Sequence, residues 1–366
     1  MNCRVPVLIG VVSLASTILA PSAFAQQGGT DIPRRPDGRP DLSGTYDTAT
    51  LTPLQRPARY GDQSVLSEEE AAAIQAGESA ALASIFNYDP AVNTEVSDPN
   101  RGAPPVGGDG STGAAGGVGG YNTFYFDRGT AGFQIDGQWR TSIITDPPNG
   151  RQPPVTEDVR AQRASRAGFL RANTGTAWWL ENDLNAAGPY DDPEVRPLSE
   201  RCLMGFGSTA GPPMLPVLYN NHKRIVQGDD TVVILVEMVH DARVVRLNQE
   251  HDPPEIRSWL GDSVGHWEGD TLVVDTTNFR DETALGQASR NLHVVERFTR
   301  TDADTLLYQF TVDDPTVWTA PWSGEYVWPV SENKVYEYAC HEANYSFGGI
   351  LRGARLLEAD ARDESR

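Results

Sequence analysis

Basic residues are scarce in this sequence. It has 30 Lys and Arg residues against 50 Asp and Glu, which gives a formal net charge of −20 over 366 residues. An acidic protein repels phosphate backbones and anionic lipid head groups. Outside the N-terminal leader, the sequence also lacks an apolar run of the roughly 20 residues that a transmembrane helix requires. We therefore expect no nucleic-acid partner and no membrane span.

Residues 1–25 have the form of an export signal. Arg4 precedes an apolar run that is shorter than a membrane anchor, and a small-x-small sequence follows the run and ends at Ala25. Signal peptidase cleaves after such a sequence. We predict cleavage near Ala25 and a mature protein that is periplasmic or secreted.

Cysteine is rare, with 3 residues in the whole chain. Cys3 is removed with the leader, so Cys202 and Cys340 remain in an oxidising compartment. Two cysteines in such a compartment usually form a disulfide, which we predict here. The alternatives are two free thiols or thiolate metal ligands, and the histidine that follows Cys340 keeps the second of these open.

Common motifs of metal, nucleotide and nucleophile sites are missing or out of context. The spacings H-x-H, H-E-x-x-H and C-x-x-C do not occur. Gly108, Gly110 and Gly113 match G-x-G-x-x-G, but prolines precede them and glycines follow, where a dinucleotide site needs a strand and a helix. Ser263 likewise lacks the strand-to-helix context of a nucleophilic serine. We predict a flexible loop over residues 102–120 and no nucleotide site.

The mature chain divides into three parts by composition. Residues 26–40 are rich in Gly, Pro, Arg and Asp and predict an extended arm. Residues 41–200 mix predicted helices, the glycine-rich loop and aromatic strands. Residues 201–366 form the third part, in which apolar and polar residues alternate from Asn221 onward, and this alternation indicates half-buried strands. We expect the last two parts to form one composite domain.

Two helices are predicted in the N-terminal half. Ser67 and Glu70 form a capping box ahead of the first helix, which runs to Phe86. Thr156 caps the second helix, over residues 157–172. The predicted strands of this half lie at residues 44–46, 121–126 and 138–145.

The C-terminal part predicts a meander of sequential strands joined by short turns. Such a meander curls into a barrel or packs as two sheets, because a long open sheet exposes its edges. We therefore predict a mainly β fold, an antiparallel barrel or sandwich, with Tyr326 and Trp328 in its core. The predicted strands lie at residues 222–227, 231–239, 242–247, 255–259, 271–278, 292–300, 304–312, 323–329 and 334–341.

Several phrases of the sequence resemble a family of exported bacterial proteins. They are HDAR at 240–243, WLGDSVGHWEGDTLVVDTTNF at 259–279, LHVVERFTRTDADTLLYQFTVDDP at 292–315 and YEYACHEANY at 336–345. The resemblance implies export and carries no specific reaction. A weaker likeness links Gly44, Thr45 and Tyr46 to the first strand of lipocalin-like barrels, which have Trp in place of this Tyr. It implies a fold and no activity.

All 6 histidines lie between residues 222 and 341, in the strand-rich part. A cofactor-free site needs a histidine to move a proton, a carboxylate to orient it and a cation to hold negative charge. If neighbouring strands turn their polar positions inward, Asp275, His293 and Arg297 line a common cavity; otherwise they face water. We expect His251, in a proline-flanked loop, to be exposed and inert. The candidate catalytic residues are His240, Asp241, Arg243, His266, Asp275, His293 and Arg297.

We therefore predict an exported enzyme that acts on a small organic molecule by histidine and carboxylate acid–base chemistry. It would need no redox cofactor and would be a lyase, isomerase or hydrolase. One alternative is a non-catalytic carrier that binds a small molecule in the same cavity. The other is an enzyme that depends on a divalent metal such as zinc or iron. Ligands for such a metal would come from His240, His266, His293, His341 and Glu342.

Overall fold

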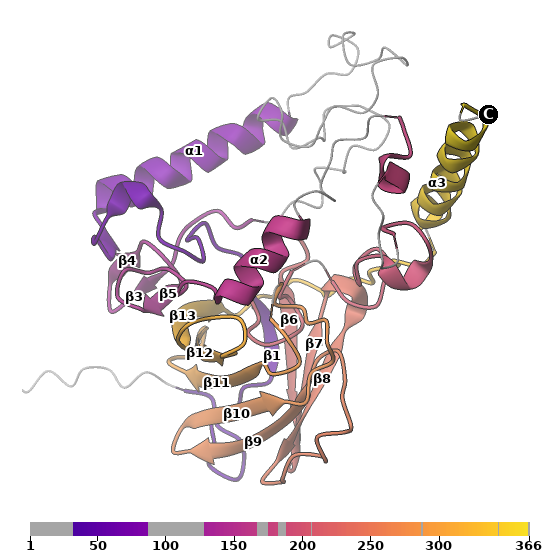
Figure 1. Cartoon of the computed structure of the whole chain (residues 1–366). Coiled ribbons are helices and arrows are strands. Elements are labelled where there is room, and N and C mark those ends of the chain that lie inside the picture. Colours follow the sequence, from indigo (N-terminus) through magenta and orange to yellow (C-terminus); the bar gives the residue numbers. More distant parts are fainter. Residues whose placement is uncertain are drawn as a thin grey trace, which may run out of the picture.

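The structure is a computed structural model (Figure 1). Within the residues that it describes, the protein consists of a large curled sheet, a small sheet, three α-helices and short 3₁₀ turns. The leader, the glycine-rich segment 102–120 and the strand predicted at 121–126 lie outside these residues. The described residues are 32–86, 128–166, 175–181, 188–205, 207–286, 288–342 and 344–364.

A mixed sheet of ten strands forms the body of the molecule. Its order is β1-β6-β7-β8-β9-β10-β11-β12-β13-β5. Neighbouring strands are antiparallel except for β8 and β9, which run parallel. The strands are β1 (Gly44–Asp47), β5 (Ile144–Asp146), β6 (His222–Gln227), β7 (Thr231–Val236), β8 (Ala242–Leu247), β9 (Asp262–Glu268), β10 (Thr271–Thr277), β11 (His293–Arg300), β12 (Thr305–Asp313) and β13 (Trp322–Pro329).

The large sheet curls so that β1 and β13 approach each other (Figure 1). Tyr46 of β1 forms a bridge with Val330, which directly follows β13. The Ser331 N–H donates to the Thr45 carbonyl over 2.8 Å. The curl covers edges that an open sheet would leave exposed. The predicted mainly β, barrel-like fold is confirmed as a half-barrel that contains one parallel strand pair.

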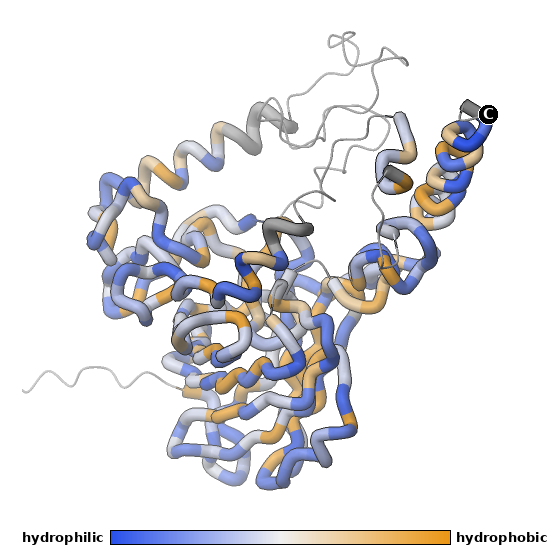
Figure 2. Tube along the Cα trace, in the orientation of Figure 1, coloured by the Kyte–Doolittle hydropathy of each residue, from blue (hydrophilic) through white to orange (hydrophobic). Residues whose placement is uncertain are grey.

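Hydrophobic and hydrophilic residues alternate along the strands (Figure 2). Because the hydrophobic positions are the buried ones, the sheet has an apolar inner face and a more polar outer face. The rings of Tyr308 and Trp328 stack with their centroids 4.6 Å apart, and Tyr308 meets Tyr326 edge-on at 5.6 Å. All three side chains are completely buried. Because aromatic rings bury large apolar areas, this cluster fills much of the interior. The predicted core positions of Tyr326 and Trp328 are confirmed.

Strand β9, which was not among the predicted strands, forms an antiparallel hairpin with β10. Gly269 in the turn of this hairpin has a φ of +60°, which L side chains rarely adopt. Gly265 lies where β9 approaches β8 most closely, and a Cβ there would be 2.8 Å from Val245 Cγ1. The two glycines therefore have structural roles, one in the turn and one in the packing of β9 on β8.

Two predicted strands are wrong. Residues 255–259 follow Pro253 and Pro254 in the connection from β8 to β9. A parallel pair needs a crossover between its strands and cannot be joined by a hairpin, so this segment is a loop. Residues 334–341 are irregular as well, because β13 already pairs with β12 on one edge and with β5 on the other.

The helices differ from the prediction mainly at the C-terminus. Helix α1 (Glu68–Phe86) begins at the predicted capping box, in which Glu70 N–H donates to Ser67 Oγ over 3.1 Å. Helix α2 is Glu157–Arg166, and the rest of its predicted range falls outside the described residues. Helix α3 (Tyr345–Glu364) follows the last predicted strand, in a region for which no helix was predicted.

Helix α3 is held by residues far away in the sequence. Ala354 packs against Trp178 and Trp179. The Trp179 Nε1–H donates to Glu358 Oε1 over 2.9 Å. The sequence pattern did not predict this helix, because the helix is stabilised by residues that are distant in the sequence.

The small sheet lies beside the large one (Figure 1). Its order is β2-β4-β3, and the strand predicted over residues 138–145 is divided between this sheet and the large one. The strands are β2 (Val65–Leu66), β3 (Gln134–Ile135) and β4 (Gln138–Arg140). The short 3₁₀ turns are η1 (Ala58–Tyr60), η5 (Trp178–Glu181), η6 (Pro193–Val195) and η7 (Met238–His240).

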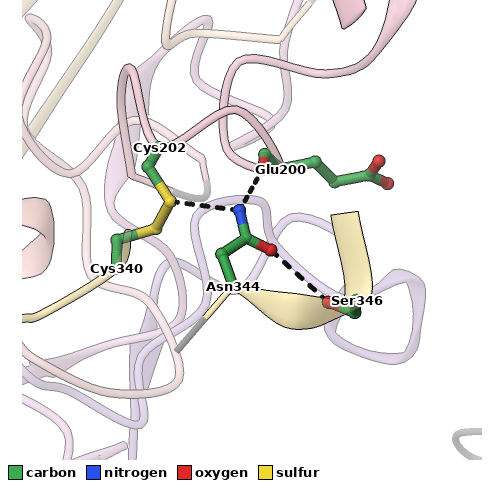
Figure 3. The surroundings of a disulfide bond; sticks show 5 residues. All are labelled: Glu200, Cys202, Cys340, Asn344 and Ser346. Carbon is green, nitrogen blue, oxygen red and sulfur yellow. Dashed lines mark hydrogen bonds between the residues drawn. A yellow bond between two sulfur atoms is a disulfide. The ribbon is translucent and has the colours of Figure 1, made fainter. Parts of the chain in front are cut away.

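A disulfide joins Cys202 to Cys340, as predicted (Figure 3). The two Cα atoms are 5.7 Å apart, across a sequence separation of 138 residues. Asn344 Nδ2 donates to the Glu200 carbonyl over 2.8 Å, so the start of α3 is fastened to the segment that holds Cys202. Such a bridge is compatible with an exported protein. Among the described residues, the helices fall short of the length and apolar character that a membrane span needs.

Candidate functional site

The predicted catalytic residues of β10 and β11 lie on the outer face of the sheet. Asp275, His293 and Arg297 alternate with completely buried residues such as Val274 and Val294. Of the two arrangements that the sequence left open, polar positions inward or facing water, the structure has the second. The apolar residues of the same strands occupy the interior, because burying an aliphatic side chain is favourable, whereas burying an ionised one costs free energy.

A chain of hydrogen bonds nevertheless brings two of these residues together. His293 Nε2 lies 2.9 Å from Asp275 Oδ2. The other carboxylate oxygen, Oδ1, lies 2.9 Å from His251 Nε2. His251 Nδ1 in turn lies 2.9 Å from Asp262 Oδ2. We call Asp262, His251, Asp275 and His293 the histidine–aspartate chain.

His251 is the residue that the sequence prediction missed. Its side chain is 27% exposed and both ring nitrogens contact carboxylates, so the prediction that His251 is exposed is wrong. The loop 248–261 folds back onto β9 and β10, where Asp252 N–H donates to Asp262 and Asn278 Nδ2 donates to the Asp252 carbonyl, each over 2.9 Å. A proline-flanked loop has no periodicity from which such a return could be predicted.

Asp262 anchors one end of the histidine–aspartate chain. Arg246 donates to Asp262 Oδ1 over 2.7 Å, in addition to the bonds from the Asp252 N–H and His251. Burial alone would raise the pKa of Asp262, but these hydrogen bonds and the charge of Arg246 outweigh it and lower the pKa. Asp262 is therefore held as an ionised acceptor for His251.

Asp275 sits between the two imidazoles. Burial would raise its pKa, but the hydrogen bonds from His293 and His251 outweigh that effect and lower it. The hydrogen bond to Asp275 raises the pKa of His293, against partial burial and with help from the charges of Asp275 and Asp313. The carboxylate thus stabilises the protonated form of His293.

The inventory of donors distinguishes the two histidines. Ionised carboxylates only accept hydrogen bonds, so His251 satisfies Asp262 and Asp275 together only when both of its ring nitrogens carry a proton. His293 uses Nε2 for Asp275, and this leaves Nδ1 as the nitrogen that can exchange a proton with a ligand. His293 is also the more exposed ring, at 43% of its side chain.

The remaining predicted residues do not join the histidine–aspartate chain. His266 and Arg297 both contact Glu268, at 3.2 and 2.8 Å, in a separate exposed group. His341 and Glu342 are exposed, after β13. His240 ends η7, and its side chain is outside the description. In the part of the chain that the structure describes, no three His, Cys, Asp or Glu side chains are grouped as metal ligands.

Arg243, predicted as an anion-binding residue, is engaged inside the sheet. Its terminal nitrogens donate to both oxygens of Glu296, over 3.0 and 2.6 Å, and both side chains are almost completely buried. Tyr308 also donates to Glu296, over 2.7 Å. Arg243 further contacts Ser263, which lies within β9 although residues 261–265 read G-x-S-x-G. Neither Arg243 nor Ser263 is therefore placed as the predicted or motif-based role requires.

A cavity of about 390 Å³ connects the two networks. It lies where β8 and β9 diverge, since their pairing begins only at Val245 and Ser263. Asp241, Arg243 and Asp262 are among its lining residues. The cavity therefore touches the end of the histidine–aspartate chain on one side and the buried Arg243 pair on the other.

Lys223 on β6 is a buried charge of another kind. Its side chain is completely buried, and its Nζ has no hydrogen-bond partner among the described residues. Burial lowers its pKa to about 7, while the charges of Glu237 and Asp47 act in the opposite direction. At neutral pH this amine is therefore divided between its charged and neutral forms.

The chain matches no model of a known protein family and no curated protein. What the site can do follows from its geometry. A carboxylate that holds an imidazole by one nitrogen fixes the orientation of the ring and stabilises its protonated form. His293 and Asp275 have this arrangement, with Nδ1 directed away from the carboxylate contact. They form a pair suited to general acid–base chemistry.

Proposed function

We propose that the protein is an exported enzyme that acts on a small organic molecule by acid–base chemistry. It needs no redox cofactor and belongs to the lyases, isomerases or hydrolases. The observation that carries the proposal is the 2.9 Å contact between His293 and Asp275. Catalytic histidines are commonly oriented by a carboxylate in this way.

In this proposal His293 exchanges a proton with the substrate through Nδ1. Its pKa is raised from the usual 6.5, and a general base is most effective when its pKa lies near the working pH. Asp275 orients the ring and stabilises the imidazolium after proton uptake. His251 holds Asp275 from the other side, and Asp262 fixes His251.

Export is supported by two independent features. The leader ends in a small-x-small sequence at Ala25, which is the form that signal peptidase cleaves. The disulfide between Cys202 and Cys340 persists in the periplasm or outside the cell. The phrases that resemble exported bacterial proteins support the same location.

A carrier that holds its ligand inside the curled sheet has less support. Tyr308, Tyr326 and Trp328 are completely buried and in mutual ring contact, so they occupy the space that such a ligand would need. Arg243 and Glu296 take up a further part of the interior as an ion pair. We therefore favour the enzyme.

The test uses the mature protein with a panel of small esters, lactones, hydroxy acids and ketones, with products and solvent-deuterium incorporation followed by NMR. For a substrate that reacts, His293→Gln should lower kcat/KM by about 100-fold or more, because a proton-transfer group is lost. The matched control is His266→Gln, which removes the same ring from the same face of the sheet. Equal activity of the two variants would rule out the proposed role of His293.

A further inference from the structure

Helix α1 presents one side to a space that is not filled by tight packing. Ala71 is buried, and Ile74 and Glu78 on the same side are half-buried. Figure 1 shows α1 as an outlying element above the small sheet and apart from the ten-stranded sheet. A helix of this kind normally packs its inner side directly against the body of the protein.

A large cavity lies under this side of the helix. Its volume is about 830 Å³, within the range of small-molecule binding pockets. We call it the α1 cleft. Its lining comprises Ile74 and Glu78 of α1, residues 50–54 and 215–219, Met238, Gly207 and Arg128.

The lining of the α1 cleft is mostly aliphatic. Leu54, Ile74, Leu215, Val217 and Met238 contribute apolar side chains from four separate segments of the chain. Leu218, at the same site, is an apolar side chain that remains 49% exposed. Apolar surface of this extent is costly to leave in contact with water and is typical of ligand sites.

The polar groups of the α1 cleft already have partners within the protein. Thr52 Oγ1 accepts from the Phe133 N–H over 3.3 Å, and Thr50 Oγ1 accepts from the Thr52 N–H over 3.2 Å. Arg128 and Glu78 face each other at 3.8 Å. Because Arg128 and Glu78 balance each other's charge, a ligand is not required to supply one.

A second cavity continues the space along the helix. It has a volume of about 250 Å³ and shares Leu51, Thr52, Pro53 and Ile74 with the α1 cleft. Ala71, one helical turn before Ile74, lines this second space. The hollow region thus extends along α1, which favours an elongated ligand over a compact one.

We propose that the α1 cleft is a binding site for an elongated, lipophilic small molecule with few hydrogen-bonding groups. None of its lining residues belongs to the histidine–aspartate chain. The site therefore stands apart from the proposed acid–base chemistry, and either proposal can fail without the other.

The experiment is a titration of the mature protein with N-phenyl-1-naphthylamine, a neutral lipophilic dye that fluoresces when it leaves water. Wild type should bind the dye saturably, and long-chain alcohols should displace it. Ile74→Glu should weaken binding by about tenfold or more, because it puts a charge into an apolar lining. Ala76→Glu puts the same charge on the exposed side of the same helix and should change the affinity by less than about twofold.

Val217→Trp provides a second variant, which fills the α1 cleft without adding charge and should also abolish dye binding. Circular dichroism and the melting temperature of each variant show whether it is folded. His293→Gln should leave dye binding unchanged. Absence of saturable binding to wild type would overturn the proposal, as would equal binding by wild type, Ile74→Glu and Val217→Trp.

Discussion

The two faces of β9, β10 and β11 carry charged networks with opposite properties. On the inner face, Arg243 and Glu296 are almost completely buried and bonded at both guanidinium ends. On the outer face, Asp275 and His293 are 35% and 43% exposed and form a single contact. His293 and Glu296 are three positions apart on β11, yet the first belongs to a titrating pair and the second to a fixed ion pair. The difference lies in access to water, which lets the outer pair exchange protons.

The largest effect should come from breaking the inner pair. Glu296→Gln leaves the Arg243 charge buried without its counter-charge, and should lower the free energy of unfolding by about 3–5 kcal/mol. Urea denaturation of the disulfide-intact protein measures this. The double variant Arg243→Met with Glu296→Leu should recover most of the loss, because it buries no charge. A loss as large in the double variant as in Glu296→Gln would show that the charge is not the cause.

Lys223 extends the comparison to a buried amine for which the described part of the chain offers no hydrogen-bond partner. The unfolded chain keeps the proton up to about pH 10.5, but the folded chain only up to about 7, so wild-type stability should rise with pH between these values. Lys223→Met should stabilise the protein by about 2–4 kcal/mol at pH 7 and remove most of that rise. Thermal melts between pH 6 and 10 test both effects, and a destabilised variant with an unchanged pH profile would contradict them.

Asp275→Asn tests the outer pair. It removes the interaction that raises the pKa of His293, so that pKa should fall toward or below 6.5, as followed by NMR of the imidazole protons. Because the pair is exposed, the expected cost in stability is only about 0.5–1 kcal/mol. Asp275 stabilises above its unfolded pKa and His293 below its own, so the cost should be greatest between about pH 4 and 6.5. An unchanged pKa of His293 in this variant would show that Asp275 does not raise it.

The smallest effect on stability is expected from substitution of Arg297, which lies on the outer face but outside the histidine–aspartate chain. Its partner is the exposed Glu268, and the contact involves no member of the histidine–aspartate chain. Arg297→Gln should leave both the free energy of unfolding and the His293 titration at their wild-type values. A shift of the His293 pKa in this variant would extend the proton-exchanging site along β11.

The sequence predicted β10 and β11 well but not which of their faces is inside, and it did not predict β9. Alternation correctly put Asp275 and His293 on faces that can meet. It could not decide the direction, because Glu296 on the opposite face is also charged and yet completely buried. Glu296 can face the interior because Arg243 of β8 pairs with it there. The alternation along one strand cannot reveal a partner that lies 53 residues away in the sequence.

The disulfide and the first helix were predicted because each has a local or compositional signal. His251 and α3 were missed for the opposite reason. His251 depends on Asp262 and Asp275 after a loop with two prolines, and α3 depends on Trp179. The elements that were missed are held by tertiary contacts that the sequence does not show.

The short parallel pairing of β8 and β9 has a mechanical consequence. Only three residue pairs join these strands, from Val245 to Leu247, whereas β11 and β12 share eight. The boundary between β8 and β9, which we call the seam, therefore has few backbone hydrogen bonds. Both charged networks cross it, Arg246 reaching Asp262 on the outside and Arg243 reaching Ser263 on the inside. At this seam, side-chain contacts replace the missing backbone hydrogen bonds. Acid that protonates the outer network should therefore weaken the contact between β8 and β9. Amide exchange in β8 should then become faster before the rest of the sheet opens.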